Sequence, residues 1–312
     1  MSEIYDVIIL GGGPAGLTAG LYAGRGRLKT LLIEKGQAGG QITLSADIEN
    51  YPGQILEGET GISLAARMAA QCDQFGTERK TDEILRVELS GDLKRLEGKK
   101  GRYQARSVIL AAGASPRPIG CANEQTFIGR GVSYCATCDG AFFRDLNVYV
   151  AGGGDSAVAE AIFLTRFARK VTVIHRRDAL RAAKALQEKA FAHPKIDFLW
   201  DSVVTRVDGG DVLQALTVKN VKTGEETVIR APEADGMLGL FGFVGYLPNT
   251  ALFEGQLPLE NGYVPTDADM RTSVPGVFAA GDIRVKSLRQ VVTACADGAI
   301  AAIQAERYLM GI

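Results

Sequence analysis

The sequence contains little that would mark a membrane protein or a nucleic-acid-binding protein. No apolar run approaches the about 20 residues that a membrane-spanning helix needs, and the opening residues Met1–Tyr5 show neither a basic region nor a cleavage site. We therefore expect no signal peptide and no contact with a membrane. Because the 312 residues carry a net charge of only -1 and show no acidic tail, we also expect no nucleic-acid partner.

Histidine and cysteine are scarce as well, with two and five residues in the chain. A structural zinc ion needs four ligands, whereas this chain offers only one closely spaced cysteine pair. We therefore predict no metal site. Five cysteines do not make a disulfide scaffold in a chain of this length. Without an export signal, the expected location is the reducing cytoplasm.

Glycine, in contrast, is abundant at 38 residues, and it forms a triplet in each of two matching segments. Residues 6–35 and residues 147–176 align without a gap. Each segment begins with a short apolar run, passes through the glycines into an Ala-rich stretch of helical period, and ends in a second apolar run. This order predicts strand, tight turn, helix and strand, the βαβ unit of α/β proteins, present twice.

The glycines of these turns have the positions that a nucleotide-binding turn requires. In the first copy, Gly11 permits the tight turn, Gly13 lets the backbone approach a pyrophosphate, and Gly16 lets the helix pack closely on the strand. The second copy repeats the first two as Gly152 and Gly154. The N-terminus of the following helix offers free N–H groups to phosphates. Two such motifs in register predict two Rossmann-like nucleotide sites.

The two copies differ where the second strand ends. Glu34 ends the first copy, and an acid there accepts hydrogen bonds from an adenosine ribose, which suits FAD or NAD. The matching residue of the second copy is His175, and Arg176, Arg177 and Arg181 follow it. Several cations without an acid are what a 2′-phosphate requires, so the second site is predicted to hold NADPH.

Two later apolar segments complete the first nucleotide unit. Ser107–Gly113 and Gly276–Arg284 each predict a strand that ends in small residues, and Asp282 can bond a ribityl hydroxyl there. Residues 288–305 predict an Ala-rich helix.

The order of these segments predicts a discontinuous domain. The supporting strand near residue 277 follows the second unit, although it belongs to the first. A Pro-rich joint, Ser115–Pro118, and a Gly-rich joint, Gly239–Gly245, flank the second unit. We therefore predict an FAD-binding domain of residues 1–116 and 244–312, with an NADPH-binding domain of residues 117–243 inserted into it.

The cysteine pair Cys135–Cys138 lies just before the second unit, and Asp139 follows it. Two cysteines at this spacing can close a small ring, and a thiolate is favoured at a helix N-terminus or beside a cation. Because a zinc site lacks further ligands and a structural disulfide suits a cytoplasmic protein poorly, we interpret the pair as redox-active. Cys72 is predicted to be a buried apolar residue.

Four runs of the sequence resemble a known family. The runs Gly129–Arg144, Gly152–Ala157, His175–Ala182 and Leu288–Ala302 resemble the low-molecular-weight thioredoxin reductases, class II of the pyridine nucleotide-disulfide oxidoreductases, and the similarity extends over essentially the whole chain. The resemblance implies an FAD-containing homodimer that passes electrons from NADPH to the disulfide of thioredoxin. It also implies that Cys138 lies next to the flavin, that Cys135 attacks thioredoxin, and that Asp139 handles the thiol proton.

The motifs and the resemblance together give the predicted site residues. The catalytic residues are Cys135, Cys138 and Asp139. The residues predicted to bind FAD are Gly11, Gly13, Pro14, Ala15, Gly16, Glu34, Lys35, Gly39, Gly40, Gln41, Asn50, Ala112, Gly113, Gly281, Asp282, Arg289, Gln290 and Val291. The residues predicted to bind NADPH are Gly152, Gly154, Asp155, Ser156, His175, Arg176, Arg177 and Arg181.

Further expectations rest on the same resemblance. Arg130 and Phe142 match positions that meet thioredoxin, although Phe142 and Phe143 are equally good candidates for a buried residue. Cys295 and Ala112 depart from the usual family residues, and Cys295 either packs in the core or approaches the flavin. The two joints are expected to act as hinges, so that the inserted domain alternates between two contacts with one flavin.

The sequence is also compatible with other functional interpretations. The same chemistry can serve a different small redoxin or disulfide. Relatives that reduce peroxiredoxins carry an added N-terminal domain, for which the early position of Gly11 leaves no room. The larger disulfide reductases need a C-terminal dimer domain with a His base, which this length does not provide. A redox sensor without catalysis and a zinc-binding structural module are the alternatives from other classes.

Overall fold

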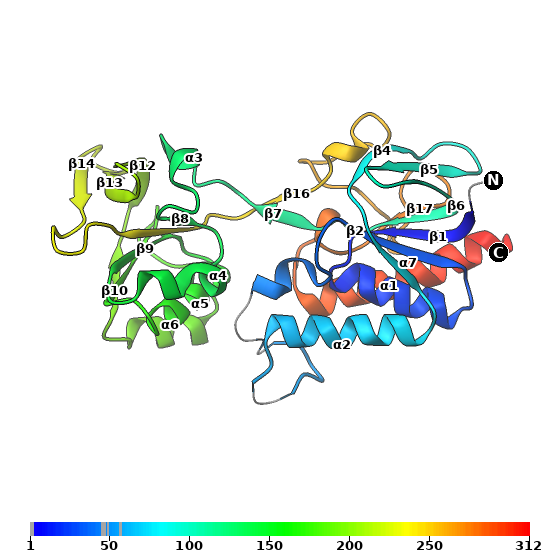
Figure 1. Cartoon of the computed structure of the whole chain (residues 1–312), viewed down its shortest axis with the longest axis horizontal. Helices are drawn as coiled ribbons and strands as arrows, with labels where there is room; N and C mark the ends of the chain where they lie inside the picture. The colour runs from blue at the N-terminus through cyan, green and yellow to red at the C-terminus, as the bar shows by residue number, and fades with distance from the viewer. Residues whose placement is uncertain (1–2, 45–47, 49, 56–57) are drawn as a thin grey trace. The chain divides into compact units, whose positions relative to one another are not determined.

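The computed structural model describes residues 3–44, 48, 50–55 and 58–312. The chain forms two compact units: unit 1 contains Met1–Ser115 and Leu247–Ile312, and unit 2 contains Pro116–Tyr246 (Figure 1). The chain crosses between the units in β7 (Ala114–Pro116) and β16 (Tyr246–Pro248), and these two strands pair with each other.

Unit 1 is built on a sheet with the strand order β3-β2-β1-β6-β5-β4, in which β17 also pairs with β6. The strands β1, β2, β3, β6 and β17 are parallel, whereas β4 and β5 join the sheet antiparallel. The strands are β1 Ile4–Leu10, β2 Thr30–Glu34, β3 Glu78–Thr81, β4 Ile84–Glu88, β5 Lys94–Gly98, β6 Arg102–Leu110 and β17 Val277–Ala279. The helices α1 (Pro14–Arg25), α2 (Gly61–Gln74) and α7 (Val291–Met310) cover one face of this sheet (Figure 1).

The central strand β1 shows why the sheet is buried on both faces. Its side chains alternate, so that Val7 and Ile9 join the core beneath the helices, and Ile8 and Leu10 join the core on the opposite face. A parallel strand covered on both sides has the continuous apolar sequence seen here. Short 3-10 segments complete unit 1: η1 Gly40–Leu44, η3 Ala251–Phe253 and η4 Gly281–Ile283.

Unit 2 has a fully parallel sheet with the order β11-β10-β9-β15-β8. The strands are β8 Val132–Ser133, β9 Asn147–Gly152, β10 Lys170–Ile174, β11 Ile196–Leu199 and β15 Gly239–Phe243. One face packs against α5 (Asp155–Leu164) and α6 (Lys184–Phe191), and the other packs against the antiparallel sheet β12-β13-β14 (Figure 1). The remaining elements are α3 Glu124–Phe127, α4 Ala136–Asp139, η2 Gly140–Phe143, β12 Ser202–Gly209, β13 Leu213–Asn220 and β14 Glu226–Arg230.

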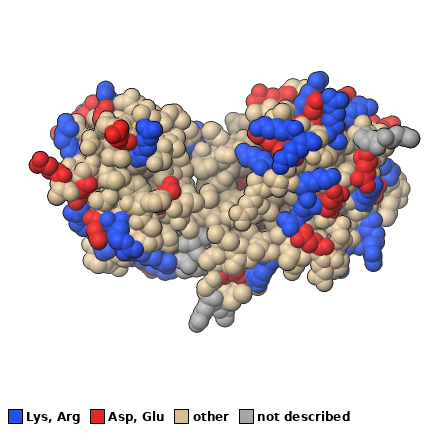
Figure 2. Space-filling view, in the orientation of Figure 1, with Lys and Arg blue, Asp and Glu red and all other residues tan. Residues whose placement is uncertain are grey.

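These two sheets confirm the predicted α/β class with two Rossmann-like units. Each glycine triplet stands between a strand and a helix, β1 and α1 in unit 1, β9 and α5 in unit 2. The helix predicted at residues 288–305 begins slightly later, at Val291, because Gln290 is its N-cap. On the face shown in Figure 2, acidic and basic side chains are mixed over both units.

The segment Gly239–Gly245 was predicted as a Gly-rich joint between the domains, but most of it is a strand of unit 2. It contains β15, which pairs with both β9 and β8, and the side chains of Leu240 and Phe241 are completely buried. The glycines here serve close packing: a Cβ on Gly239 would lie 2.7 Å from the Phe143 ring, and one on Gly242 would lie 2.6 Å from the Tyr134 ring. A glycine count therefore misjudged this strand as a linker.

In the described part of the chain, no helix has both the length and the apolar character that crossing a bilayer requires.

The packing of α7 on α1 generates a prediction. A Cβ on Gly298 would overlap the Ala15 carbonyl oxygen of α1. Gly298→Ala should therefore lower the free energy of unfolding by about 1–3 kcal/mol, the usual cost of overpacking, although Ala favours helices over Gly. Chemical denaturation measures this change.

The control for this prediction is Gly36→Ala. No atom lies within 4 Å of a Cβ placed on Gly36, so its stability should stay within about 0.5 kcal/mol of the original. A Gly298→Ala protein as stable as this control would disprove the tight contact between the helices.

Candidate functional site

A disulfide joins Cys135 and Cys138, whose Cα atoms lie 5.3 Å apart. Cys135 is the N-cap of the single helical turn α4, and its sulfur accepts a hydrogen bond from the Cys138 backbone N–H at 3.1 Å. The Ser133 hydroxyl accepts one from the Cys135 N–H at 3.0 Å, which fixes the start of the turn. In the reduced form, an N–H group in this position favours a thiolate on Cys135 over the thiol.

The residues around the disulfide differ in exposure. Cys138 is exposed, whereas Cys135 and Asp139 are half-buried. Phe142 is 77% exposed, and Phe143 is buried edge-on against Phe241 at a centroid distance of 5.3 Å. Of the two phenylalanines, Phe143 is therefore the core residue. Arg130 is also exposed.

The turn between β1 and α1 can be built only with glycine at two positions. Gly11 has a φ of +109°, and a Cβ there would lie 2.6 Å from the Ala111 carbonyl carbon. A Cβ on Gly16 would overlap the Gly11 carbonyl oxygen. The helix begins at Pro14. Its N-cap residue is Gly13, so no side chain accepts hydrogen bonds from the first N–H groups. Its first N–H groups therefore remain available to an anion.

Glu34 lies at the end of β2 with its carboxylate turned onto this turn. Its Oε2 accepts a hydrogen bond from the Gly12 N–H at 2.7 Å, and its Oε1 accepts one from the Lys35 N–H at 2.7 Å. The Gly39 N–H donates to the Gly12 carbonyl at 2.7 Å, which brings the next loop onto the glycine turn. In dinucleotide-binding folds, an acid at the end of this strand is the type of residue that accepts hydrogen bonds from ribose hydroxyls.

Other predicted positions meet at the same end of the sheet. A Cβ on Gly40 would lie 3.1 Å from the Gly13 Cα, and Gln41 follows in η1 with an exposed side chain. Asn249 holds the end of β6, because its Nδ2 donates to the Ala112 carbonyl at 2.8 Å and its N–H donates to the Gly113 carbonyl at 3.0 Å. Sequence reasoning missed Asn249, since a single asparagine carries no motif.

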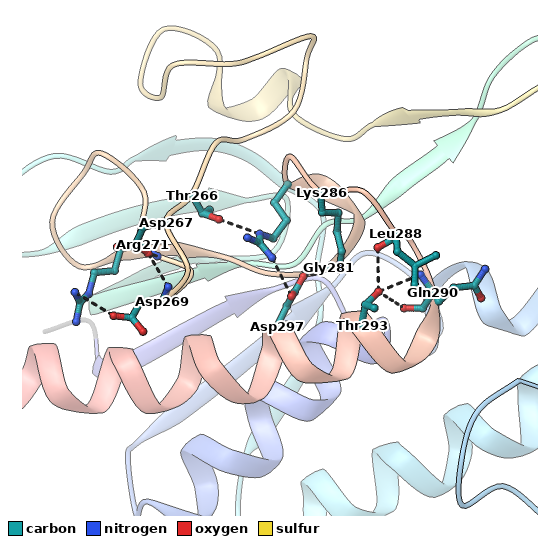
Figure 3. Close-up of polar contacts among 11 residues, drawn as sticks. Thr266, Asp267, Asp269, Arg271, Gly281, Lys286, Leu288, Gln290, Thr293 and Asp297 are labelled. Atoms are coloured by element: carbon teal, nitrogen blue, oxygen red, sulfur yellow. Dashed lines mark hydrogen bonds and ion pairs between the residues drawn. The ribbon is translucent and has the colours of Figure 1, made fainter.

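Asn50 and Gln290, far apart in the chain, are brought together. The Asn50 Nδ2 donates to the Gln290 Oε1 at 3.0 Å. Gln290 is also the N-cap of α7, in a capping box with Thr293, and Val291 is the first residue of the helix (Figure 3).

The loop after β17 is fixed by a buried carboxylate, that of Asp297 on α7 (Figure 3). Its oxygens accept a hydrogen bond from the Gly281 N–H at 3.0 Å and form ion pairs with Arg284 at 2.9 Å and Lys286 at 2.7 Å. The side chains of Asp297, Arg284 and Lys286 are only 8%, 12% and 9% exposed, so the network is shielded from water. Asp282 follows Gly281 and is thereby held in place.

One oxygen of the Asp282 carboxylate is unpaired. Its Oδ1 is buried and has no hydrogen-bond partner among the described residues. Burial raises the pKa of the Asp282 carboxyl above its usual value, while the nearby cations Lys286 and Arg289 oppose the rise. A buried acceptor that the protein leaves unpaired is suited to a donor from a ligand.

The second glycine turn, between β9 and α5, is as tight as the first. Gly152 has a φ of +154°, and a Cβ there would lie 2.5 Å from the Phe243 carbonyl oxygen. Gly154 is the N-cap of α5 and leaves open space around its Cα.

The Asp155 carboxylate, in the first turn of α5, accepts a hydrogen bond from the Ala183 N–H at 2.7 Å. Ser156 is exposed beside it.

The basic run after β10 divides into a buried and an exposed part. The His175 ring is buried under Gly153, and its burial and the neighbouring Arg181 lower its pKa, so it is neutral at pH 7. Arg176, Arg177 and Arg181 are exposed, and none forms an ion pair with the part of the chain that the structure describes. Three guanidinium groups without an ion pair in the described chain have the charge and the donors that a phosphate requires.

The remaining cysteines are free thiols. Cys72 is buried, as expected, and burial raises its pKa to about 11. Burial raises the pKa of Cys121 to about 11 as well. Cys295 is half-buried, and burial raises the pKa of its thiol, while hydrogen bonding with Thr18 and Tyr51 opposes the rise. In the described residues, no three His, Cys, Asp or Glu side chains lie close enough together to hold a metal ion.

Comparisons with known proteins agree with this geometry. Residues 5–298 match the family described as Pyridine nucleotide-disulphide oxidoreductase. The thioredoxin reductase of Peptoclostridium acidaminophilum is 54% identical over 310 residues, which cover 99% of this chain and 98% of the relative. The thioredoxin reductase of Peptoclostridium litorale is 55% identical, with the same coverage. The crystal structure of Lactococcus lactis thioredoxin reductase has a TM-score of 0.94 and 44% identity, and the match covers 99% of this chain and 100% of that one.

Two nucleotide-type turns and a short-spaced disulfide on two α/β units define a pyridine nucleotide-disulfide oxidoreductase. The chain belongs to that family and, within it, to the thioredoxin reductases, as the sequence motifs predicted.

The network around Asp297 generates a prediction. Asp297→Asn leaves Arg284 and Lys286 buried without a counter-charge, and should lower the free energy of unfolding by about 3–5 kcal/mol. Urea denaturation of the purified variant measures it. The control is Asp269→Asn, whose pair with Arg271 is 45% and 49% exposed. That change should cost less than about 1 kcal/mol. Similar small losses in both variants would contradict a structural role for Asp297.

Proposed function

We propose that this chain reduces the disulfide of thioredoxin with electrons from NADPH, through FAD and the Cys135–Cys138 disulfide. The observation that carries the proposal is this disulfide, which precedes a nucleotide-type unit while the other three cysteines are free thiols. The similar proteins are thioredoxin reductases, which supports thioredoxin as the substrate.

The fit of FAD to unit 1 rests on the turn and on one unpaired atom. The first turn of α1 would face the pyrophosphate, and Glu34 would accept the ribose hydroxyls. The buried Oδ1 of Asp282 needs a donor, and a ribityl hydroxyl supplies one. The predicted residues around these three features, from Gly11 to Val291, would complete the site, and the domain assignment of residues 1–116 and 244–312 follows.

The fit of NADPH to unit 2 rests on the exposed arginines. Gly154 and the first turn of α5 would face the pyrophosphate, and Arg176, Arg177 and Arg181 would bind the 2′-phosphate. Buried and neutral, His175 would shape the turn from below rather than supply a charge. Residues 117–243 would form this domain.

Within the reaction, the two cysteines have separate tasks. When bound, NADPH supplies a hydride and FAD relays its electron pair to a disulfide. The opened pair leaves two thiols, and the Cys138 N–H favours the thiolate form of Cys135. That thiolate attacks a thioredoxin sulfur, and the displaced sulfur leaves as a thiolate. Cys138 then attacks Cys135 in the mixed disulfide, which restores the Cys135–Cys138 bond and releases reduced thioredoxin.

Asp139, next to Cys138 in the chain, would accept and return the thiol proton.

The proposal includes a homodimer in the cytoplasm. The free thiols of Cys72, Cys121 and Cys295 suit a reducing compartment. A shallow hollow with apolar side chains from α1 and α7, including Tyr22, Ile300 and Ile303, offers a surface for a second copy. Light scattering of the purified protein would report the mass of the assembly.

Separate roles for the two cysteines generate a prediction. The test uses a thioredoxin with a single active-site cysteine, activated as a mixed disulfide with thionitrobenzoate. Reduced Cys138→Ser should release one equivalent of the yellow thiol and remain linked to thioredoxin, because Cys135 attacks and nothing resolves the link. Reduced Cys135→Ser should release it far more slowly. Mass spectrometry and absorbance measure both.

The same experiment includes steady-state turnover. NADPH oxidation by the wild type should require thioredoxin, and both variants should fall to background. If NADPH bleaches the flavin but thioredoxin does not restore its colour, the substrate is another small redoxin. Equal release by both cysteine variants would contradict the assignment of Cys135 as the attacking residue.

The arginine run generates a prediction on coenzyme choice. Replacing Arg176, Arg177 and Arg181 together by Gln should raise the KM for NADPH at least about 100-fold, since the loss of only two hydrogen bonds to a charged group, at about 1.5 kcal/mol each, already gives that factor. The KM for NADH, which lacks the 2′-phosphate, should stay within a few-fold. Initial rates with both coenzymes measure the change.

Arg230→Gln, an exposed arginine on β14, is the matched control and should alter neither KM. An equal rise in both KM values for the triple variant would indicate damage to the fold rather than a lost phosphate contact.

A further inference from the structure

Arg289 lies at an unusual place in unit 1, just before α7. Its Nε is buried and has no hydrogen-bond partner among the residues that the structure describes, although Nε–H is a donor. The guanidinium carbon lies over the Tyr263 ring, 4.1 Å from the ring centroid. A guanidinium within about 6 Å of a ring centroid is attracted to the ring face. Tyr263 therefore contacts the guanidinium group through its ring, while the Arg289 Nε–H stays without a partner in the described chain.

A second unpaired atom belongs to the same unit. The buried Oδ1 of Asp282 is an acceptor without a donor, and the positive charge of Arg289 is close enough to lower the pKa of this carboxyl. The two groups form no ion pair with each other in the described chain, although they have opposite charges. A buried donor and a buried acceptor that do not satisfy one another are both left for a third group.

The backbone couples Tyr263 to the Asp282 loop. Glu260 and Tyr263 exchange two backbone hydrogen bonds of 2.9 Å, which close a tight turn. The next residue, Val264, is completely buried, and it donates to the Ile283 carbonyl at 3.0 Å and accepts from the Val285 N–H at 3.0 Å. The Tyr263 ring thus extends from a segment that is paired with the loop of Asp282.

We propose that Tyr263 is a positioning residue of the flavin site, which fixes Arg289 by a cation–π contact so that its Nε–H and the Asp282 carboxylate bind the flavin as a donor and acceptor pair. This inference rests on the proposed binding of FAD to unit 1. Asp282 takes a hydroxyl of the ribityl chain, and the Arg289 Nε–H takes an acceptor atom of the flavin. Tyr263 touches Arg289 and acts through it.

The chemistry of the pair explains why an aromatic residue is needed. An acidic partner would neutralise Arg289 and occupy its N–H groups. A ring face holds the guanidinium by its π-electrons without accepting an in-plane hydrogen bond, so every N–H in the plane stays available. The contact therefore sets the direction of the arginine and preserves both its charge and its donors.

Three variants test the proposal in the protein freed of its flavin. Tyr263→Leu should weaken FAD binding about tenfold, measured as the Kd from quenching of flavin fluorescence. Tyr263→Phe keeps the ring face and should bind FAD within about twofold of the wild type. Arg289→Leu removes the charge and should weaken FAD binding at least as much as Tyr263→Leu.

The combination of variants separates positioning from a purely structural effect. In an Arg289→Leu background, Tyr263→Leu should cause no further loss of FAD affinity, because the residue through which it acts is already gone. The flavin midpoint potential should fall in Tyr263→Leu and be restored in Tyr263→Phe, since a fixed positive charge near the flavin favours its reduction. Thermal unfolding without flavin checks that all variants are folded.

Each outcome decides the inference. Additive losses in the double variant, or a Phe variant as weak as the Leu variant, would overturn the positioning role of Tyr263. Wild-type protein that fails to bind FAD at all would overturn the proposed function instead. Wild-type affinity in Tyr263→Leu would leave FAD binding intact and overturn this inference alone.

Discussion

Unit 1 depends on one close approach of backbone to backbone at the start of α1. On one side, Gly16 lies against the Gly11 carbonyl and fixes the helix on β1. On the other side, Ala15 lies against Gly298 of α7, and a Cβ on Gly281 would lie 2.8 Å from the Ala15 Cβ. The glycine turn, the last helix and the Asp282 loop therefore meet around the first turn of a single helix. No larger side chain fits at this point, and the rest of the site takes its position from it.

In unit 2, the glycine turn is supported by a different side chain than in unit 1. At the end of the second strand, Glu34 in unit 1 bonds the glycine turn through a carboxylate, whereas His175 in unit 2 packs its ring beneath Gly153. Both residues support the turn, although only the acid carries a charge there. The same backbone scaffold can thus present an acidic edge in one unit and a basic edge in the other, because the exposed arginines of unit 2 come from the residues that follow.

Much of the fold and of the candidate site was predictable from the sequence, because the motifs that define them are local. The glycine turns are local: a strand, a glycine triplet and a helix in order leave few conformations, so both Rossmann-like units and the strands on either side of each turn and helix were predicted. The cysteine pair was recognisable for the same reason. In contrast, the segment Gly239–Gly245 was misjudged, because glycine composition cannot distinguish a flexible linker from a strand that packs against aromatic rings.

Contacts between distant segments were not predictable from one sequence. Asn249 caps the end of β6, and Tyr263 holds Arg289, yet neither residue belongs to a local motif. The burial of His175 also depends on tertiary packing, since a histidine before two arginines resembles a third cation until its surroundings are known. Tertiary packing decides which side chains contact one another, so the spacing of residues in the sequence does not reveal these contacts.

The unpaired carboxylate of Asp282 has a consequence for the life of the protein in a cell. A buried acceptor without a donor costs free energy in the folded chain until a ligand pairs it. A ligand that binds only the folded state adds its binding free energy to folding. Newly made chains should therefore persist in proportion to the supply of that ligand, and those left without it should be degraded sooner.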